Sequence, residues 1–180
     1  MWEAQDWPDK ELIIVDDIDD PSFPGGLWAP RVTYLRMERE SVGYKLNIGC
    51  DWAEGEMICR FDSDDRYAPG RITDQVRRLQ VTGMAVTNYT PLLFTDGASW
   101  WRNENTPGGY GASLCFRRDW WEAHPFPDVN EGEDWHFVME ATRANQFVAA
   151  DGKDFMVAVT HPGNSTKRVV GHGWIPIECR

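Results

Sequence analysis

Two apolar runs that each end in aspartates constrain the fold of this chain more than any other feature. Residues 12–15 (LIIV) are followed directly by Asp16 and Asp17, and residues 57–61 (MICRF) are followed by three carboxylates within residues 62–65. The run at 12–15 is continuous, which is typical of a strand buried on both faces of a parallel sheet, and the run at 57–61 is apolar except for Arg60. The sequence therefore predicts acidic side chains at the carboxyl ends of strands, where open α/β sheets bind ligands.

Helical patterns between these runs predict an α/β fold. The spacing of Val42, Leu46, Gly49 and Ala53 predicts a helix, with Gly55 as the left-handed residue behind it. Further helices are expected over 72–82 before Gly83, over 119–123 with Asp119 as cap, and from 132 onwards; further strands over 31–36, 85–89, 113–116, 147–150 and 155–159; and loops over 18–30 and 95–112. We expect residues 1–180 to form one domain, with a Rossmann-like, mostly parallel central sheet flanked by helices.

Composition narrows the class of protein. The chain has 180 residues, of which 42% are hydrophobic and 26% are charged, as in an ordinary globular domain. Its net charge of −11 and its lack of a long basic run disfavour nucleic-acid binding. The four cysteines lack the spacing of a zinc site or a disulfide framework, and no signal peptide or membrane-length apolar run occurs. We therefore expect a soluble, cytoplasmic protein.

The acidic cluster at 62–65 is a candidate metal site. Asp62 and Asp64 point the same way if the strand continues through them, since side chains alternate between the faces of a strand. Two converging carboxylates favour a hard divalent cation such as Mg²⁺ or Mn²⁺, whose shell is commonly completed by water and substrate phosphates. The pattern predicts a metal–diphosphate site; the alternative is a solvated acidic turn before Pro69.

Several motifs occur together in one order along the chain. They are ELIIVDD at 11–17, Lys45-Leu46-Asn47, AEGE at 53–56, FDSDD at 61–65, Pro69, GGYGAS at 108–113 and GED at 132–134. In this order they resemble the family 2 glycosyltransferases, which are inverting nucleotide-sugar enzymes with the GT-A fold. The resemblance covers roughly residues 8–165. It implies a metal-dependent enzyme that moves a sugar from a nucleotide-diphosphate sugar, most simply a UDP-sugar, to a hydroxyl acceptor.

The resemblance also implies roles for residues that bind the donor. Asp17, with Asp16, is expected to accept hydrogen bonds from the uracil or ribose, and Lys45 to face the nucleotide or its pyrophosphate. Asp62 is expected near the ribose and the metal, and Asp64 is expected to ligate Mn²⁺ or Mg²⁺. The alternatives are ordinary ones: a turn at the strand end for the aspartates, and a solvated helix face for Lys45.

The remaining implied roles concern catalysis and the acceptor. Asp134 resembles the general base, and His161 resembles a late histidine that some members place on the metal or diphosphate. Asp134 could instead be the acid that favours any helix N-terminus, and His161 a loop histidine. Apart from the resemblance, the adjacent pair Trp100 and Trp101 is the best candidate among the ten tryptophans for a sugar-stacking platform, with core or rim packing as the alternative. Gly109, Tyr110 and Glu133 are also expected on the acceptor side.

The start of the chain departs from the family pattern. Members usually begin with an apolar strand and a short loop around the base, whereas this chain begins MWEAQ. We expect one flank of strand 12–15 to lack its partner, giving either a homodimer through that edge or weak donor affinity. Two other functions stay open: a binding domain without turnover, and a nucleotidyltransferase, which the absence of a glycine-rich phosphate loop disfavours.

Overall fold

The central sheet carries most of the core. The computed structural model describes residues 2–17, 30–104, 108–164 and 174–177, and every structural statement below concerns these residues. The sheet has the strand order β3 (Met57–Cys59), β8 (Cys115–Arg117), β5 (Val86–Tyr89), β9 (Phe147–Ala150). Strand β8 is antiparallel to both of its neighbours, and β5 is parallel to β9.

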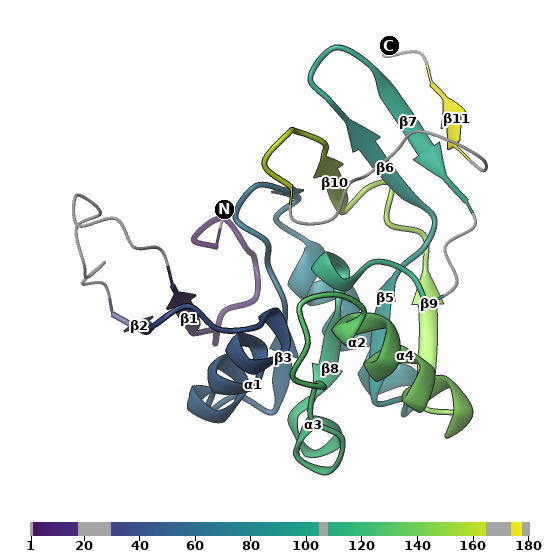
Figure 1. Cartoon of the computed structure of the whole chain (residues 1–180). Coiled ribbons are helices and arrows are strands. Elements are labelled where there is room, and N and C mark those ends of the chain that lie inside the picture. Colours follow the sequence, from purple (N-terminus) through teal and green to yellow (C-terminus); the bar gives the residue numbers. More distant parts are fainter. Residues whose placement is uncertain (1, 18–29, 105–107, 165–173, 178–180) are drawn as a thin grey trace.

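Helices cover both faces of this sheet (Figure 1). The covering helices are α2 (Arg71–Thr82) on one face, and α1 (Val42–Trp52), α3 (Arg118–Ala123) and α4 (Glu133–Arg143) on the other. Strand β8 illustrates the division, because successive strand residues point to opposite faces. Its Cys115 packs in the cluster with Val76 and Leu79 of α2, while Phe116 packs with Phe137 of α4.

A second sheet lies beside the first and carries a long hairpin (Figure 1). Its strand order is β11 (Trp174–Pro176), β7 (Trp100–Asn103), β6 (Leu92–Thr95), β10 (Met156–Val159), β4 (Arg66–Tyr67). The expectation of a loop over 95–112 was thus wrong for residues 100–103, which pair with β6. The signal was weak because this strand is short and rich in indoles rather than alternating.

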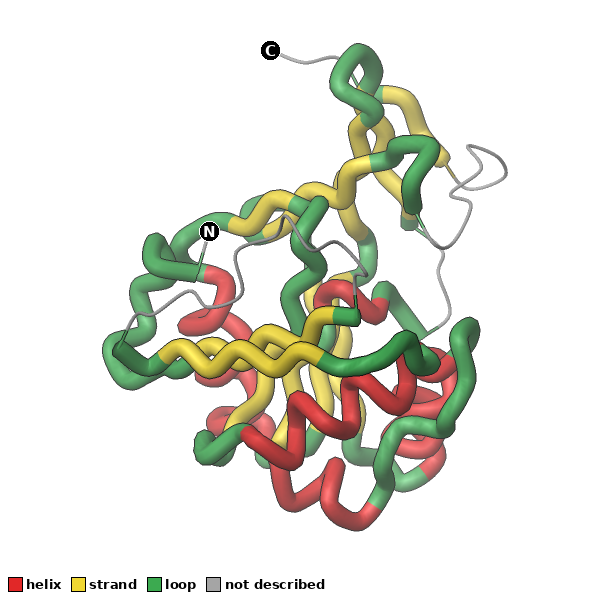
Figure 2. The backbone as a smooth tube through the Cα atoms, turned by 60° about the vertical axis from the view of Figure 1, so that its left-hand side comes forward, coloured by secondary structure: helices red, strands yellow, loops and turns green. Residues whose placement is uncertain are grey.

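The first two strands form a separate parallel pair. Strand β1 (Leu12–Asp16) aligns residue by residue with β2 (Val32–Arg36) and with no other described strand. Figure 2 shows the pair running side by side across the front of the molecule, next to a helix. The α/β, GT-A-like fold is confirmed, although its sheets are mixed and not mostly parallel as expected.

Element ends follow local chemistry. Helix α1 starts after Ser41, whose Oγ accepts from the Tyr44 N–H at 3.0 Å, and α2 ends at Gly83 with φ of 70°, as predicted. The prediction for Gly55 was wrong, because α1 ends on extended Ala53. Two predicted bounds also shifted, since α3 is preceded by Arg117 rather than capped by Asp119, and residues 111–113 form the 3₁₀ turn η1 (Gly111–Ser113) before β8.

The predicted loop at 18–30 lies almost wholly outside the described residues. Among the described helices, none has the length and apolar character to cross a bilayer.

Candidate active site

Three carboxylates gather just beyond the end of β3. One oxygen from each of Asp62, Asp64 and Asp65 lies within 4.8 Å of the others. Asp65 is buried, and its Oδ1 accepts from the Val159 N–H at 2.8 Å, which ties the cluster to β10. The fold therefore concentrates negative charge at one point, as the sequence predicts.

The segment after β10 adds an imidazole to the acidic cluster. His161 Nε2 lies 2.8 Å from Asp64 Oδ2, and Asn164 Nδ2 donates to the same oxygen at 2.9 Å. The Gly163 N–H lies 3.1 Å from His161 Nδ1, a contact in which Nδ1 accepts and Nε2 carries the proton toward Asp64. A histidine distant in sequence thus meets the carboxylate that the family resemblance singles out. Carboxylate oxygens suit Mg²⁺ and Mn²⁺, and an imidazole nitrogen is a common ligand of divalent transition metals.

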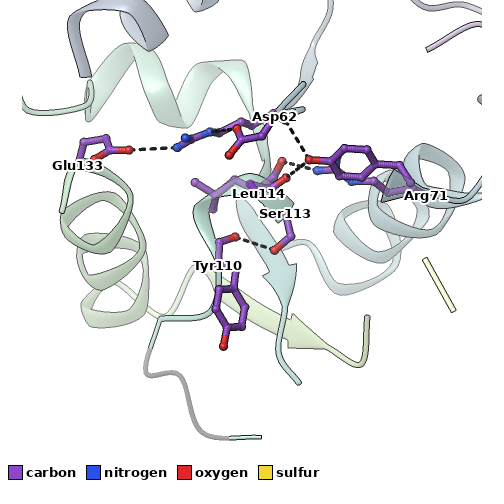
Figure 3. A network of polar contacts seen from close by, with 9 residues as sticks. Asp62, Arg71, Tyr110, Ser113, Leu114 and Glu133 are labelled. Carbon is purple, nitrogen blue, oxygen red and sulfur yellow. Dashed lines mark hydrogen bonds and ion pairs between the residues drawn. The ribbon is translucent and has the colours of Figure 1, made fainter. Parts of the chain in front are cut away.

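Arg60 joins the acidic cluster to the start of α4. Its Nε donates to Asp62 Oδ1 at 3.0 Å and its Nη1 donates to Glu133 Oε1 at 3.1 Å. Figure 3 shows Asp62 and Glu133 linked through the side chain between them. Burial lowers the pKa of Arg60, but Asp62, Glu133 and Asp134 outweigh it and raise that pKa overall, so the bridge stays charged. Burial also raises the pKa of Glu133, with help from Asp134 and against Arg60.

Asp134 stands in the first turn of α4 against η1. Its Oδ1 accepts from the Trp135 N–H at 2.7 Å. A Cβ placed on Gly111 would lie only 2.1 Å from Asp134 Oδ2, so the carboxylate sits where only a glycine leaves room. Gly132 immediately precedes α4, and its φ of 83° lies in the left-handed region that favours glycine. Asp134 is therefore a half-buried carboxylate at a helix N-terminus, next to the Arg60–Glu133 pair.

The aspartates at the end of β1 have partners within their own sheet or on α1. Tyr34 of β2 donates to Asp16, and Lys45 Nζ of α1 donates to Asp17 Oδ2 at 2.7 Å. The pKa of the Asp17 carboxyl is lowered, mainly by the hydrogen bond from Lys45, while partial burial acts in the opposite direction. The pair Lys45–Asp17 therefore places one cation and one anion together at the strand exit.

Two of the residues expected on the acceptor side, Trp101 and Tyr110, pack against the same apolar cluster around Phe94. Trp100 and Trp101 are successive residues of β7, so their indoles point to opposite faces and cannot stack one sugar together. Trp101 packs 6.2 Å from Trp174, ring centre to ring centre. Tyr110 packs edge-on against Phe94 at 4.9 Å, and its carbonyl accepts from Ser113 Oγ at 2.6 Å (Figure 3). Gly109, with φ of 68°, passes against the amide of Asn88.

The groups that hold these side chains in place were not predicted from the sequence. Arg60 was visible as a charge inside an otherwise apolar strand, a signal that a buried partner must exist. Tyr67, which accepts from the Asp62 N–H at 2.9 Å and donates to the Ala112 carbonyl at 3.2 Å, gave no local signal. Asn164 was part of the HPGN segment, but nothing in its spacing pointed to Asp64.

Replacing Arg60 by methionine is expected to lower the free energy of unfolding by about 2–3 kcal/mol, because Asp62 and Glu133 lose a charged donor in a mostly buried site. The measurement is urea unfolding followed by tryptophan fluorescence. Arg117→Met is the matched control, since Arg117 pairs with the exposed Asp119 and should cost less than about 1 kcal/mol. Equal losses in the two variants would show that Arg60 bridges nothing of importance.

The Lys45–Asp17 pair should make stability depend on pH in one direction. A folded-state pKa below the unfolded one adds stability above the unfolded pKa, and this stability is lost as the pH falls through the folded pKa. Lys45→Met is therefore expected to lower the free energy of unfolding by about 1 kcal/mol at neutral pH. This gap between the variant and the unaltered protein should close below about pH 4. Urea unfolding at several pH values measures it, and Asp17→Asn should remove the pH-dependent part. A gap independent of pH would contradict the pairing.

Comparison with known proteins identifies the family and the fold. The model of the family described as "Glycosyl transferase family 2" matches residues 3–145. Among solved structures, Staphylococcus aureus TarS 1-349 in complex with UDP-GlcNAc aligns with a TM-score of 0.72 and 18% identity, over 91% of this chain and 54% of that chain. The mannosyltransferase PcManGT from Pyrobaculum calidifontis, in complex with GDP-Man and Mn²⁺, aligns with a TM-score of 0.65 and 19% identity, over 88% and 50% respectively.

The solved structures show the fold and the family model shows the family; neither shows which reaction this chain catalyses. This chain spans about half the length of the two solved structures. No curated protein sequence matches it significantly. The predicted family is confirmed, because the family model matches well over half of the residues: the chain belongs to glycosyl transferase family 2.

Proposed function

We propose that this protein is a metal-dependent inverting glycosyltransferase that moves a sugar from a nucleotide-diphosphate sugar, preferably a UDP-sugar, to a hydroxyl acceptor. The observation that carries the proposal is the link between two acidic groups. Asp62 of the acidic cluster and Glu133 beside Asp134 share the single guanidinium of Arg60. A leaving diphosphate needs carboxylates that can hold a metal ion, and an attacking hydroxyl needs a carboxylate that can act as a base. Sugar transfer requires these two groups of carboxylates to lie close to one another.

The donor nucleotide is assigned to the exit of β1. Asp16 and Asp17 can accept from the N–H and O–H groups of a base or ribose, and Lys45 supplies a cation beside the phosphates. Binding would require Lys45 to exchange or share its bond to Asp17. The aspartates stand at a strand exit, where α/β proteins bind nucleotides.

The acidic cluster is assigned to the diphosphate. Asp64, with Asp62 and His161, would hold Mn²⁺ or Mg²⁺, and such a cation, when bound, neutralises the negative charge that develops on the departing diphosphate. To act as a ligand through Nε2, His161 would carry its proton on Nδ1 instead, and the contact of Nδ1 with the Gly163 N–H would be given up. Asn164 and Val159 fix the orientation of two of the carboxylates and so limit the reorganisation that binding requires.

Asp134 is assigned as the general base. It takes the proton of the acceptor hydroxyl while the oxygen bonds to the anomeric carbon and the bond from that carbon to the diphosphate breaks. Attack opposite the leaving group inverts the anomeric centre. Glu133 and Arg60 are positioning residues, because their ion pair holds the first turn of α4 against the acidic cluster. Tyr110, Gly109 and one of the two tryptophans of β7 are assigned to the acceptor side.

A donor screen tests the proposal. Purified protein is incubated with UDP-, GDP- and dTDP-sugars, with Mn²⁺, Mg²⁺ or EDTA, and both the release of nucleoside diphosphate and the thermal midpoint are measured. Metal-dependent release with one donor is the expected result. Stabilisation without release would favour the second candidate, a binding domain without turnover; the separation of β1 and β2 from the central sheet is the observation that favours it. Transfer of a nucleotidyl group would overturn both.

A further inference from the structure

Two cysteines that are far apart in the sequence face each other in the central sheet. Cys59, at the end of β3, lies opposite Cys115, at the start of β8, in the antiparallel register of these strands. Their sulfur atoms are 3.0 Å apart, in hydrogen-bond contact, although the residues are 56 positions apart. The pairing of the two strands, and not a local motif, therefore brings these thiols together.

The register at this point suits a disulfide bond. The next pair along the ladder is hydrogen-bonded, because the Arg60 N–H donates to the Leu114 carbonyl at 2.9 Å. Hydrogen-bonded and open pairs alternate between antiparallel strands, so Cys59 and Cys115 form an open pair. The Cα atoms of an open pair are about 4.5 Å apart, within the range of about 4.4–6.8 Å that a disulfide spans. Oxidation can therefore join the two sulfurs without a change of register.

The two thiols differ in their access to solvent. Cys115 is fully buried, whereas Cys59 is half-buried and lines a cavity of about 410 Å³. Ile72 and Val76 of α2 line the same cavity. A small reagent in this cavity meets Cys59 before it can meet Cys115. An accessible thiol in contact with a buried one is the arrangement of an attacking and a resolving cysteine.

A buried positive charge acts on both sulfurs. Arg71 of α2 has 0% of its surface exposed; its Nε donates to Gln75 Oε1 at 3.0 Å and its Nη2 to the Leu114 carbonyl at 3.3 Å (Figure 3). Both partners are neutral, and Nη1 has no hydrogen-bond partner within the described residues. Burying a charge that is hydrogen-bonded to no anion is costly, and a thiolate is an anion that this site can supply.

The surroundings favour the thiolate of Cys59 over that of Cys50, which lines the same cavity. The hydrogen bond with Cys115 lowers the pKa of the Cys59 thiol, burial raises it, and the charge of Arg71 lowers it, so that this pKa is lowered overall. Burial raises the pKa of the Cys50 thiol to about 12, against the charge of Arg118. Because the thiolate is the nucleophile in disulfide exchange, Cys59 is the reactive thiol of the two.

We propose that Cys59 and Cys115 form a redox-active dithiol, which low-molecular-weight dialkyl disulfides oxidise to an intramolecular disulfide. The Cys59 thiolate attacks one sulfur of the reagent, whose S–S bond breaks and releases a first thiolate. Cys115 then gives up its proton and attacks the Cys59 sulfur of the mixed disulfide, which releases the second thiolate. Both released thiolates take up protons, so the dithiol loses two electrons and the reagent becomes two thiols. This modification site is separate from the residues assigned to sugar transfer.

Oxidation of the folded chain with 2-hydroxyethyl disulfide tests the proposal independently of any enzymatic activity. The substitution Cys179→Ser leaves Cys50, Cys59 and Cys115, which allow three different disulfide pairs. Intact mass is followed in time, and cross-linked peptides are identified after alkylation and proteolysis without reduction. We expect the folded chain to lose two hydrogen atoms, to contain the Cys59–Cys115 link alone, and to regain both thiols with dithiothreitol. The same chain unfolded in urea is the matched control and should give a mixture of the three pairs.

Single variants separate the two roles. Cys115→Ala is expected to stop at the mixed disulfide on Cys59, because no resolving thiol remains. In Cys59→Ala, Cys115 should react at least about tenfold more slowly than Cys59 does in Cys115→Ala, since a fully buried thiol reacts only when the structure opens. Cys50→Ala should form the link at the rate of the unaltered chain.

The proposal is overturned if the folded chain keeps its three thiols under conditions that oxidise the unfolded chain. A link that includes Cys50, or a stable mixed disulfide in a chain that still has Cys115, would overturn it as well. Circular dichroism shows whether the alanine variants fold. Should one of them fail to fold, the time course of the chain with all three thiols decides, because the mixed disulfide must form on Cys59 before the link appears.

Discussion

Replacing Asp134 by asparagine is expected to reduce sugar transfer by about 10²–10⁴-fold while leaving donor binding unchanged. The amide keeps the shape of the carboxylate beside Gly111 and the hydrogen bond from the Trp135 N–H, but it cannot accept the proton of the acceptor hydroxyl. The measurements are the rate of nucleoside diphosphate release at saturating donor and acceptor, and the dissociation constant for UDP with Mn²⁺ by calorimetry.

Glu140→Gln is the matched control, because Glu140 is an exposed carboxylate on the same helix, two turns further on. It should transfer sugar at the rate of the unaltered protein. Unchanged turnover in the Asp134 variant would assign this carboxylate to the helix N-terminus alone and would move the base to another residue. A parallel loss of UDP affinity would instead indicate that the change disturbs the site as a whole.

Replacing Asp64 by alanine is expected to weaken Mn²⁺-dependent UDP binding by at least about 10²-fold, since even residues behind a metal ligand cost 10–100-fold in metal affinity. The residue is one-third exposed, and its loss also removes one of three clustered negative charges. The free energy of unfolding without metal should therefore change by less than about 1 kcal/mol.

Thermal shifts with UDP and Mn²⁺, alone and together, measure this effect. Asp119→Ala serves as the control, because Asp119 is an exposed carboxylate paired with an arginine away from the acidic cluster. His161→Ala should give a smaller loss, because it leaves all three carboxylates in place. Full stabilisation of the Asp64 variant by UDP with Mn²⁺ would mean that residues 62–65 form a solvated acidic turn and not a metal site.

The sequence determined the features that depend on neighbours along the chain. The apolar runs at 12–15 and 57–61 specify β1 and β3, and the aspartates behind them specify what stands at their exits. The spacing of apolar residues and Gly83 specify α2 and its end. The order of the short motifs was enough to indicate the family. Each of these follows from periodicity and local backbone preference, which a single segment carries by itself.

Only the tertiary structure decided which segments pair and which side chains meet. The antiparallel insertion of β8 between β3 and β5, and the separation of β1 and β2 from the central sheet, depend on partners distant in sequence. The same is true of Arg60, which reaches Glu133 across 73 positions, and of His161, which reaches Asp64 across 97. A strand pattern specifies which faces are apolar, but it leaves the identity of the neighbouring strand open, because backbone hydrogen bonds are the same for every sequence.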